Sequence, residues 1–572
     1  MTTFRFLAGS AIALAAFPVA AASTGAFSPQ RLSEVDKTIS SDAFQGRGTA
    51  SAIEPTVINY IADEFKAAGV QPGGDIVNGK RGWFQAVPLL ESQIAGTPEI
   101  SLSENGTVVP LRQGPDIAVL APLNGAKQID IANAPLVFVG YGVDAPERSW
   151  NDFKGQDMHG KILVELVNDP DFESAPGEPV AGKFGGKAMT YYGRWTYKYE
   201  EAARQGAAGV ILIHETAPAS YGWEVVQNSN TNAQFDILRA SPAAEHTPFE
   251  SWIQRPLAIQ LFQRSGLDLE QAKVAARRPD FQPISLKATL SAHYAANTQT
   301  ITSHNVIGLL PGRRYPDETI IYSAHWDHLG VSKPDVTGDR IYNGAVDNGT
   351  GIAELIEQAR VFAQGPRPER SIVFLAVTGE EKGLLGSNYY ASHPLYPLGM
   401  TVANLNVDAW IPDGPQKDFT IRGTAKLDLL DDLIAEGKRD GRYYTPDPHP
   451  ETGGFYRSDH FSFAKVGVPA MSFSAGLDLV NGGVARGEAI ANDYNAHHYH
   501  QPSDEWSPNW DWSGVAQNAE LLHRLGLRLA NSREWPNWSQ DSEFRATRDQ
   551  SAAERTAAPP PKPVRPAKGE RG

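Results

Sequence analysis

The sequence predicts an α/β fold in which a mixed, largely parallel sheet lies between two layers of helices, with a second, β-rich α/β unit inserted into it. After about residue 285, buried strands alternate with helices, a pattern typical of a parallel sheet covered on both faces. Residues 129–284 instead consist of short β-rich runs separated by Gly, Pro and Asp turns. A chain of 572 residues is also too long for one ordinary core.

The first 22 residues have the composition of a signal peptide. Arg5 precedes an apolar stretch over residues 6–19, and three alanines at 20–22 form a small-residue cleavage site. We therefore expect residues 1–22 to be removed, the mature chain to begin at Ser23, and the protein to be secreted or periplasmic.

Residues 23–128 are predicted to form the N-terminal part of the main α/β domain. Val57, Ile61, Phe65 and Ala68 have the spacing of one apolar helix face, and Gly69 is placed to end that helix.

The inserted unit is predicted over residues 129–284. Residues 136–139 and 161–164 are expected as strands, and residues 199–205 as a helix that ends at Gly206. A buried strand over 209–213 should follow.

The rest of the main domain is predicted over residues 285–535. Residues 371–377 are predicted to form one of its strands. Residues 350–363 and 512–530 are predicted to form helices that cover the sheet. Residues 536–572 are predicted to be a Pro/Ala/Arg-rich disordered tail, because such a composition cannot build a core.

Composition excludes several function classes. The net charge of -15 repels a phosphate backbone, so we expect no nucleic-acid partner. The absence of cysteine rules out thiol catalysis and leaves His, Asp and Glu as possible metal ligands. No apolar run after the N-terminal segment is long enough to span a bilayer, so no membrane anchor is expected. The oligomeric state stays open.

Acidic and histidine side chains follow three predicted strands. Residues 319–324 lead into His325 and Asp327, residues 372–378 lead into Glu380 and Glu381, and residues 402–406 lead into Asp408. Ligands of open α/β sheets bind beyond the carboxyl ends of the strands, so these side chains are expected at one edge.

Two further segments complete a predicted metal site: residues 343–351, which contain Asp347, and residues 499–504, which contain His500. Imidazole nitrogen and carboxylate oxygen suit zinc, and two close ions often share a carboxylate. The candidate ligands are His325, Asp347, Glu381, Asp408 and His500.

These residues, with residues 41–48 and 304–306, make the chain resemble the M28 peptidases, a family of zinc exopeptidases that includes secreted bacterial aminopeptidases. The resemblance runs to about Asp504 and is interrupted by the inserted unit. That unit looks like a protease-associated domain, with glycines at 140, 142, 206 and 209.

The resemblance implies a role for each residue. Asp347 would bridge two zinc ions, His325 and Asp408 would complete one site, and Glu381 and His500 the other. Cobalt or manganese could replace zinc at such oxygen-rich sites.

Two more roles follow from the same resemblance. Glu380 would be the general base for a metal-activated water, and Asp327 would accept the second imidazole N–H of His325. The peptide bond between Asp347 and Asn348 would be cis. Tyr456 and Asp459 are candidates for the substrate pocket.

Some assignments stay open at this stage. His497 and His498 compete with His500 as the ligand, His328 is expected to be structural or to support a ligand, and His460 is either a pocket or a loop histidine. The sequon at Asn348 is interpreted as accidental, because a glycan there would block the metals.

The function predicted from the resemblance is removal of N-terminal residues from peptide substrates by a di-zinc aminopeptidase. A carboxypeptidase of the same family is an alternative, for which Arg457 could hold a terminal carboxylate. The second alternative is a receptor-like binding protein that has lost catalytic activity. The sequence retains every expected metal ligand and Glu380, which argues against this alternative.

Overall fold

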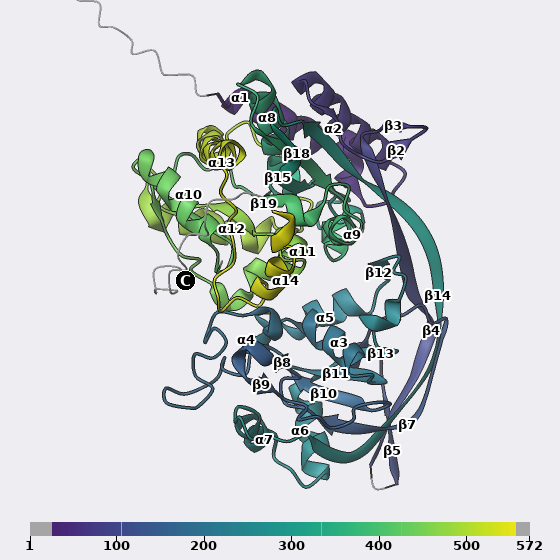
Figure 1. Ribbon diagram of the computed structural model, residues 1–572. Coiled ribbons are helices and arrows are strands. Elements are labelled where there is room, and N and C mark those ends of the chain that lie inside the picture. The colour runs from purple at the N-terminus through teal and green to yellow at the C-terminus, as the bar shows by residue number, and fades with distance from the viewer. Residues whose placement is uncertain (1–25, 105, 333, 425, 556–572) are drawn as a thin grey trace, which may run out of the picture.

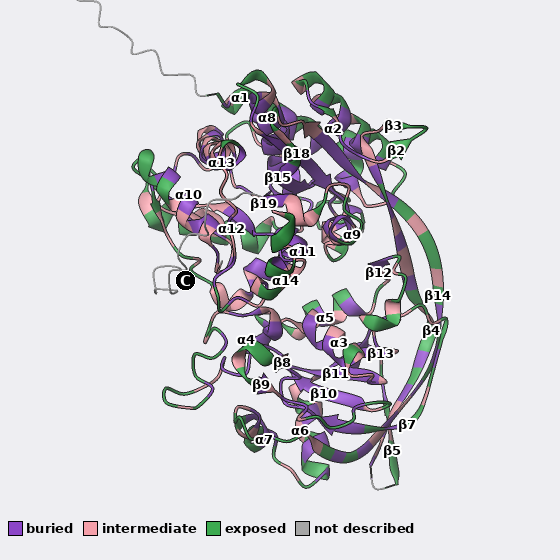
Figure 2. Cartoon of the chain, in the orientation of Figure 1, coloured by how far each residue is buried: buried purple, intermediate pink, exposed green. Residues whose placement is uncertain are grey.

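The computed structural model describes residues 26–104, 106–332, 334–424 and 426–555. Two units lie one above the other and are joined along one side by two very long antiparallel strands (Figure 1), β4 (Phe84–Glu104) and β14 (Ile284–Leu310). Where these strands pass between the units, their residues are largely exposed (Figure 2). The same two strands continue into both hydrophobic cores.

The upper unit is built on a mixed, largely parallel sheet. Its parallel strands are β15 (Tyr315–His325), β18 (Arg370–Val377), β19 (Thr401–Val407) and β22 (Ala470–Ala475). The strand β20 (Asp418–Ile421) pairs antiparallel with β22, and β14 pairs antiparallel with β18. Together with the two helical layers described next, this confirms the predicted α/β fold.

Helices cover both faces of this sheet. On one face lie α1 (Pro29–Ile39), α2 (Glu54–Ala68), α8 (Thr350–Gln364) and α13 (Ser513–Asn531). On the other lie α9 (Leu385–Ser392) and α11 (His460–Lys465). As predicted, α2 ends at Gly69, whose φ of 96° lies in the left-handed region that glycine adopts without strain.

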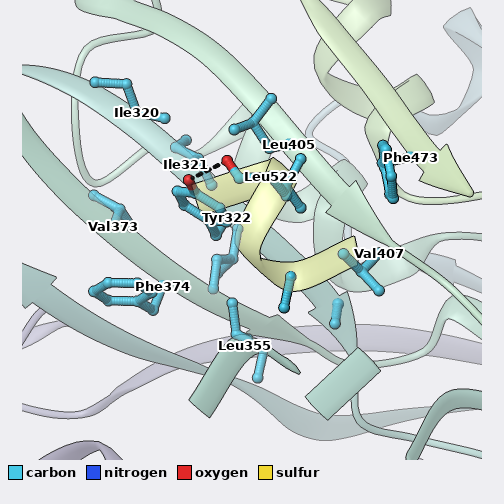
Figure 3. Packing of buried hydrophobic residues seen from close by; sticks show 14 of the residues in the cluster. Ile320, Ile321, Tyr322, Leu355, Val373, Phe374, Leu405, Val407, Phe473 and Leu522 are labelled. Carbon is cyan, nitrogen blue, oxygen red and sulfur yellow. Dashed lines mark hydrogen bonds between the residues drawn. The ribbon is translucent and has the colours of Figure 1, made fainter. Parts of the chain in front are cut away.

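The centre of this core is apolar and tightly packed. Tyr322 of β15 is fully buried between Phe374 and α13, and its hydroxyl donates to the carbonyl oxygen of Leu522 at 3.0 Å (Figure 3). This bond satisfies the one polar atom that the tyrosine brings into the core.

The inserted unit has its own parallel sheet and two cores. Its strands are β7 (Gln128–Phe138), β10 (Ile162–Leu166), β11 (Gly209–His214) and β13 (Phe249–Gln254), with β6 (Ile117–Val119) antiparallel at the edge. One face packs on α6 (Arg255–Arg264) and α7 (Leu269–Ala276), and the other on α3 (Trp195–Arg204) and α5 (Trp223–Asn230).

The predicted start of this unit at residue 129 is wrong. Ile100, Leu111 and Ile117 already belong to its core, as does Tyr294 beyond the predicted end at 284. The reason is that β4 and β14 run unbroken through both cores, so no turn or change of composition marks the boundary.

The tail predicted from residue 536 also begins too early. Residues 536–555 fold against the upper unit and include α14 (Arg545–Gln550). Trp538 is 1% exposed, and its indole donates to the carbonyl oxygen of Gly467 at 3.0 Å. The predicted signal peptide, residues 1–22, and residues 556–572 lie outside the described residues. In the part of the chain that the structure describes, no helix has the length and apolarity that crossing a membrane requires.

Candidate metal centre

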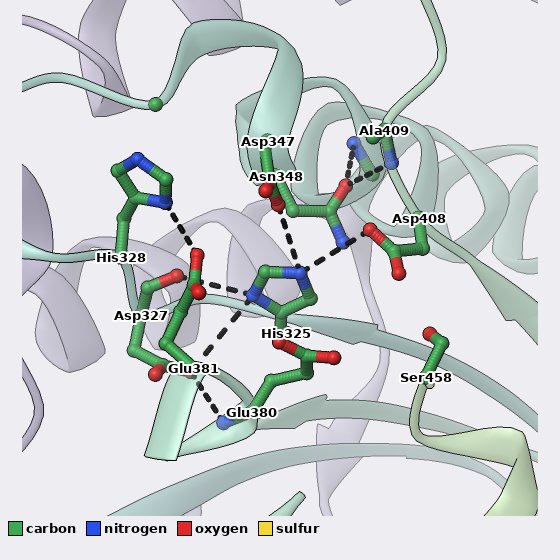
Figure 4. A network of polar contacts seen from close by, with 12 residues as sticks. His325, Asp327, His328, Asp347, Asn348, Glu380, Glu381, Asp408, Ala409 and Ser458 are labelled. Atoms are coloured by element: carbon green, nitrogen blue, oxygen red, sulfur yellow. Dashed lines mark hydrogen bonds and ion pairs between the residues drawn. The ribbon is translucent and has the colours of Figure 1, made fainter. Parts of the chain in front are cut away.

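The carboxyl ends of three parallel strands bring the predicted residues together. His325 is the last residue of β15, Glu380 and Glu381 follow β18, and Asp408 follows β19. Figure 4 shows these side chains converging at one edge of the sheet with Asp347, which comes from the turn before α8. His500 reaches the same place from the loop after α12 (Gly483–His497).

Asp347 lies at the centre of the cluster and faces a histidine on each side. Its Oδ1 is 3.2 Å from Nε2 of His325, and its Oδ2 is 3.3 Å from Nε2 of His500. A carboxylate whose two oxygens point to two separate donor groups has the arrangement of a bridging ligand.

Each side of this bridge has a second carboxylate. Oδ1 of Asp408 is 3.4 Å from Nε2 of His325, and Oε2 of Glu381 is 3.1 Å from Nε2 of His500. His325, Asp347 and Asp408 each offer a ligand atom, and these atoms lie within 4.8 Å of one another. The side chains at this edge therefore form two half-sites that share Asp347.

His328 is a second histidine on the Glu381 side. Its Nδ1 lies 2.6 Å from Oε1 of Glu381, and it forms a compact group with Asp347 and Glu381. His500 instead contacts both carboxylates through one nitrogen, and the ring of Tyr499 stacks on it with centroids 3.9 Å apart. This geometry favours His500 as the ligand and His328 as the group that orients Glu381.

The charges of the cluster depend on one another. Burial alone would lower the pKa of His325, but Glu380, Asp347 and Asp408 raise it well above its usual range. Burial would raise the pKa of Asp347, but the neighbouring imidazoles of His325 and His500 hold it well below its usual range. Burial raises the pKa of Glu380, and Asp408 and Glu381 raise it further.

The donor set fits divalent zinc. Nitrogen and carboxylate oxygen are the ligands that zinc takes in the absence of cysteine. Oδ1 of Asp347 is buried and has no hydrogen-bond partner, although it faces His325. A buried carboxylate oxygen without a hydrogen bond is costly unless a cation is bound there.

Asp327 supports this centre in a different way from the one predicted. Nδ1 of His325 donates to the main-chain carbonyl of Asp327 at 3.1 Å, whereas the nearest carboxylate oxygen is 3.9 Å away. The carboxylate is used elsewhere, because it accepts from the N–H of Glu380 at 3.1 Å and from the hydroxyl of Thr49 at 2.9 Å. Asp327 thus orients the histidine through its main chain and Glu380 through its side chain.

The peptide bond between Asp347 and Asn348 is cis, as the resemblance implied. Asn348 is fully buried and its amide donates to the carbonyl oxygen of Val407 at 3.1 Å. A side chain in this position cannot carry a glycan, which agrees with the interpretation of the sequon as accidental.

The two predicted pocket residues lie in different surroundings. Asp459 is fully buried beside α11, and burial raises its pKa to about 7. Tyr456 is turned away from the cluster: its hydroxyl donates to Glu543 at 3.1 Å, and it lines a separate cavity of about 320 Å³ at the junction with the inserted unit. The prediction for Tyr456 does not fit this position, because its buried hydroxyl needs the acceptor that the C-terminal segment provides.

Two residues that shape the centre were given no role from the sequence. Asp504 accepts hydrogen bonds from the main chain of Val346 and Asp347, and Arg47 binds the loops on either side of the cluster. The available signal for Arg47 was its place in the 41–48 segment that carries the family resemblance.

Parts of the chain are similar in sequence to a peptidase family and to individual peptidases. Residues 305–525 match the family model described as Peptidase family M28. A "Probable zinc metalloprotease" of Pyricularia oryzae is 40% identical over 87 residues, which cover 15% of this chain and 17% of that protein. "Aminopeptidase YwaD" of Bacillus subtilis is 37% identical over 109 residues, or 19% of this chain and 22% of that protein. The matched region thus spans less than a quarter of either relative's length.

Among solved structures, the aminopeptidase from Aneurinibacillus sp. strain AM-1 aligns over 88% of this chain and 94% of its own, with 19% identity and a TM-score of 0.48.

Proposed function

We propose that the protein, whose residues 305–525 match the model of peptidase family M28, is a di-zinc aminopeptidase that removes N-terminal residues from peptides. The observation that carries the proposal is the position of Asp347, whose two carboxylate oxygens face His325 and His500 separately. His325, Asp347 and Asp408 would hold one ion, and Asp347, Glu381 and His500 the other. When bound, zinc polarises a peptide carbonyl and lowers the pKa of water.

Glu380 is proposed as the general base. Its carboxylate lies in the cluster but is not one of the proposed ligands, and its raised pKa suits a group that must both take up and release a proton. Its main-chain N–H donates to Asp327 at 3.1 Å, which fixes the turn that carries it. Glu380 would take a proton from the attacking water and deliver it to the departing amine.

The charge of the site supports a substrate with a free amine. Four carboxylates, those of Asp347, Glu380, Glu381 and Asp408, converge at this sheet edge. A protonated or metal-directed N-terminal amine is attracted to such a surface, whereas a C-terminal carboxylate is repelled unless an arginine offsets it. Arg422 donates to the main-chain carbonyl of Asp408 at 3.1 Å, so it could offset that repulsion and permit the carboxypeptidase alternative. Arg457, which the sequence offered for this role, is exposed.

The test combines metal content with hydrolysis of matched aminoacyl substrates whose amine is free or blocked. Wild type should bind two zinc ions and cleave only the free-amine substrates. Glu380→Gln should keep both ions and lose about 10²- to 10⁴-fold in kcat. Cleavage of N-blocked peptides alone would indicate a carboxypeptidase, and two bound ions without cleavage would indicate a binding protein.

Export is part of the proposal and rests on the composition of residues 1–22. The check is N-terminal sequencing of protein recovered from the periplasm or the medium, where a start at Ser23 is expected. A start at Met1 in that fraction would contradict cleavage.

A further inference from the structure

The segment from Gly46 to Thr49 lies between the two loops that carry the central ligands. Arg47 within it is 1% exposed and donates to main-chain carbonyls only. Its Nε reaches Trp326 at 2.8 Å, its Nη2 reaches Gly344 at 2.8 Å, and its Nη1 reaches both Asn343 at 2.6 Å and Ile39 at 3.0 Å.

These acceptors belong to the segments that position His325 and Asp347. Trp326 follows His325 directly, and Asn343 and Gly344 belong to the turn that ends in Asp347. One rigid guanidinium therefore joins the main chain beside one proposed ligand to the main chain beside the other. The two side chains must meet the same ion, and their contact distance is 3.2 Å.

The main chain of residues 46–49 packs closely between the loops that carry His325 and Asp347. The N–H of His328 donates to the carbonyl of Arg47 at 3.2 Å. Gly46 has a φ of 65°, and a Cβ on it would lie 2.5 Å from the carbonyl oxygen of Gly330 and 2.6 Å from that of Tyr342. Since only glycine fits there, the segment cannot shift without moving both loops.

The charge of Arg47 also suits its position. Burial lowers its pKa, while Asp36, Asp504 and Asp347 around it act to raise it. Arginine keeps its proton at any ordinary pH, so a fixed positive charge lies beneath a cluster of carboxylates that repel one another.

We propose that Arg47 is a positioning residue that holds His325 and Asp347 at the spacing required by the first metal ion, and so controls metal affinity. The inference rests on the proposed function, because it assumes that these two residues bind a metal. A lysine cannot replace Arg47, because its three donors leave from one nitrogen and cannot span four carbonyls.

The control is Arg370, which is equally buried and also donates to main-chain carbonyls, those of Leu529 and Glu534. Its Nε donates in addition to the carboxylate of Glu318 at 2.6 Å. It stands at the first residue of β18, the end of the strand opposite to the site. Arg370→Lys should lower the stability of the protein as much as Arg47→Lys does, without affecting the metal centre.

The experiment measures zinc affinity by competition with a chelator, in the absence of substrate, for wild type, Arg47→Lys, Arg47→Met and Arg370→Lys. The Arg47 variants should bind the first ion about 10- to 100-fold more weakly than wild type, and Arg370→Lys should match wild type. At saturating zinc, Arg47→Lys should recover most of its kcat, because Arg47 touches neither substrate nor the reacting atoms.

Unchanged zinc affinity in a folded Arg47→Lys would overturn the inference and leave Arg47 with a structural role only. If the Arg47 variants do not fold, the zinc affinity of Asn343→Ala tests the inference instead. The side-chain amide of Asn343 holds the same turn by donating to the carbonyl of Ser40 at 2.8 Å and to the carboxylate of Asp42 at 3.0 Å. Asn343→Ala should weaken zinc binding several-fold, and an unchanged affinity would reject the proposal. Zinc binding and hydrolysis by the wild type test the proposed function itself. A failure of the proposed function is therefore distinguishable from a failure of the Arg47 inference.

Discussion

Asp504 holds the turn that carries Asp347: its Oδ2 accepts from the main-chain N–H of Asp347 at 3.1 Å, and its Oδ1 accepts from that of Val346 at 3.0 Å. The carboxylate is 2% exposed, and the hydroxyl of Tyr494 donates to it as well, at 3.1 Å. Asp504 thus provides the acceptors for two adjacent main-chain N–H groups of the turn that precedes α8. It fixes the main chain next to the proposed bridging ligand.

Asp504→Asn is expected to destabilise the protein by about 1–3 kcal/mol, because one N–H would then face an amide NH₂ instead of an oxygen. Urea denaturation of the metal-free protein measures the change. Glu505→Gln, a change at the exposed neighbour, is the control and should stay within about 0.5 kcal/mol of wild type. Equal stability of the two variants would show that Asp504 is not needed for this turn.

The two histidines on the Glu381 side should differ in their effect on metal content. His500→Gln is expected to remove one of two zinc ions, because Nε2 of His500 contacts both Asp347 and Glu381. His328→Gln should retain both ions with weaker binding, since His328 contacts Glu381 through Nδ1 and would act by orienting it. Metal analysis after dialysis against a zinc buffer distinguishes them.

The reverse result, with one ion lost in His328→Gln and two kept in His500→Gln, would exchange the roles. His328, Asp347 and Glu381 are close enough together to make that exchange physically possible.

The sequence predicted the parts of the site that depend on side-chain type and strand order. His325, Glu381 and Asp408 could be placed at one edge because each follows a buried run, and parallel strands end on the same side. Asp347 and His500 lie in loops, where periodicity gives no information. They were named as candidates for their ligand chemistry, and the family resemblance implied their roles.

The parts that were missed depend on the main chain. Arg47 binds four carbonyls contributed by three separate segments, and a carbonyl has no signature in the sequence. Asp327 was expected to reach His325 through its carboxylate, but its carbonyl does so. The boundary of the inserted unit was missed because β4 continues without a break through two cores.

The C-terminal segment contributes stability that its composition concealed. Trp538 is 1% exposed, packs on Phe544 with ring centroids 5.0 Å apart, and donates to Gly467. Trp538→Ala is therefore expected to lower the free energy of unfolding by about 3–5 kcal/mol, because apolar burial is lost and a cavity remains. Thermal denaturation measures this, with Val480→Ala, at a 58% exposed position, as the control.

Removal of residues 556–572 should leave the melting temperature unchanged, since their Pro-rich composition cannot build a core. Removal of residues 536–572 should lower it strongly. A similar loss from both truncations would show that the terminal residues also stabilise the fold.

A buried glutamate in α8 should make stability depend on pH. Glu354 is 1% exposed, and burial raises its pKa to about 8, although the amide of Gln358 donates to it at 2.7 Å. Between its ordinary pKa near 4.5 and this value, the folded protein keeps a proton that the unfolded chain has lost. The unfolded state binds fewer protons there, so stability falls as pH rises through this interval and levels off above pH 8.

Glu354→Gln is neutral at every pH and keeps an oxygen for Gln358, so it should not show this loss. Between pH 5 and pH 8, we expect the free energy of unfolding of the variant to rise relative to that of wild type by a few kcal/mol, at roughly 1.4 kcal/mol per pKa unit. Urea denaturation at both pH values gives the difference, with a chelator present because metal binding is itself pH-dependent. The exposed Glu488→Gln is the control. A parallel pH dependence of Glu354→Gln and wild type would mean that Glu354 ionises in the folded protein at its ordinary pKa, with water or a cation reaching it inside α8.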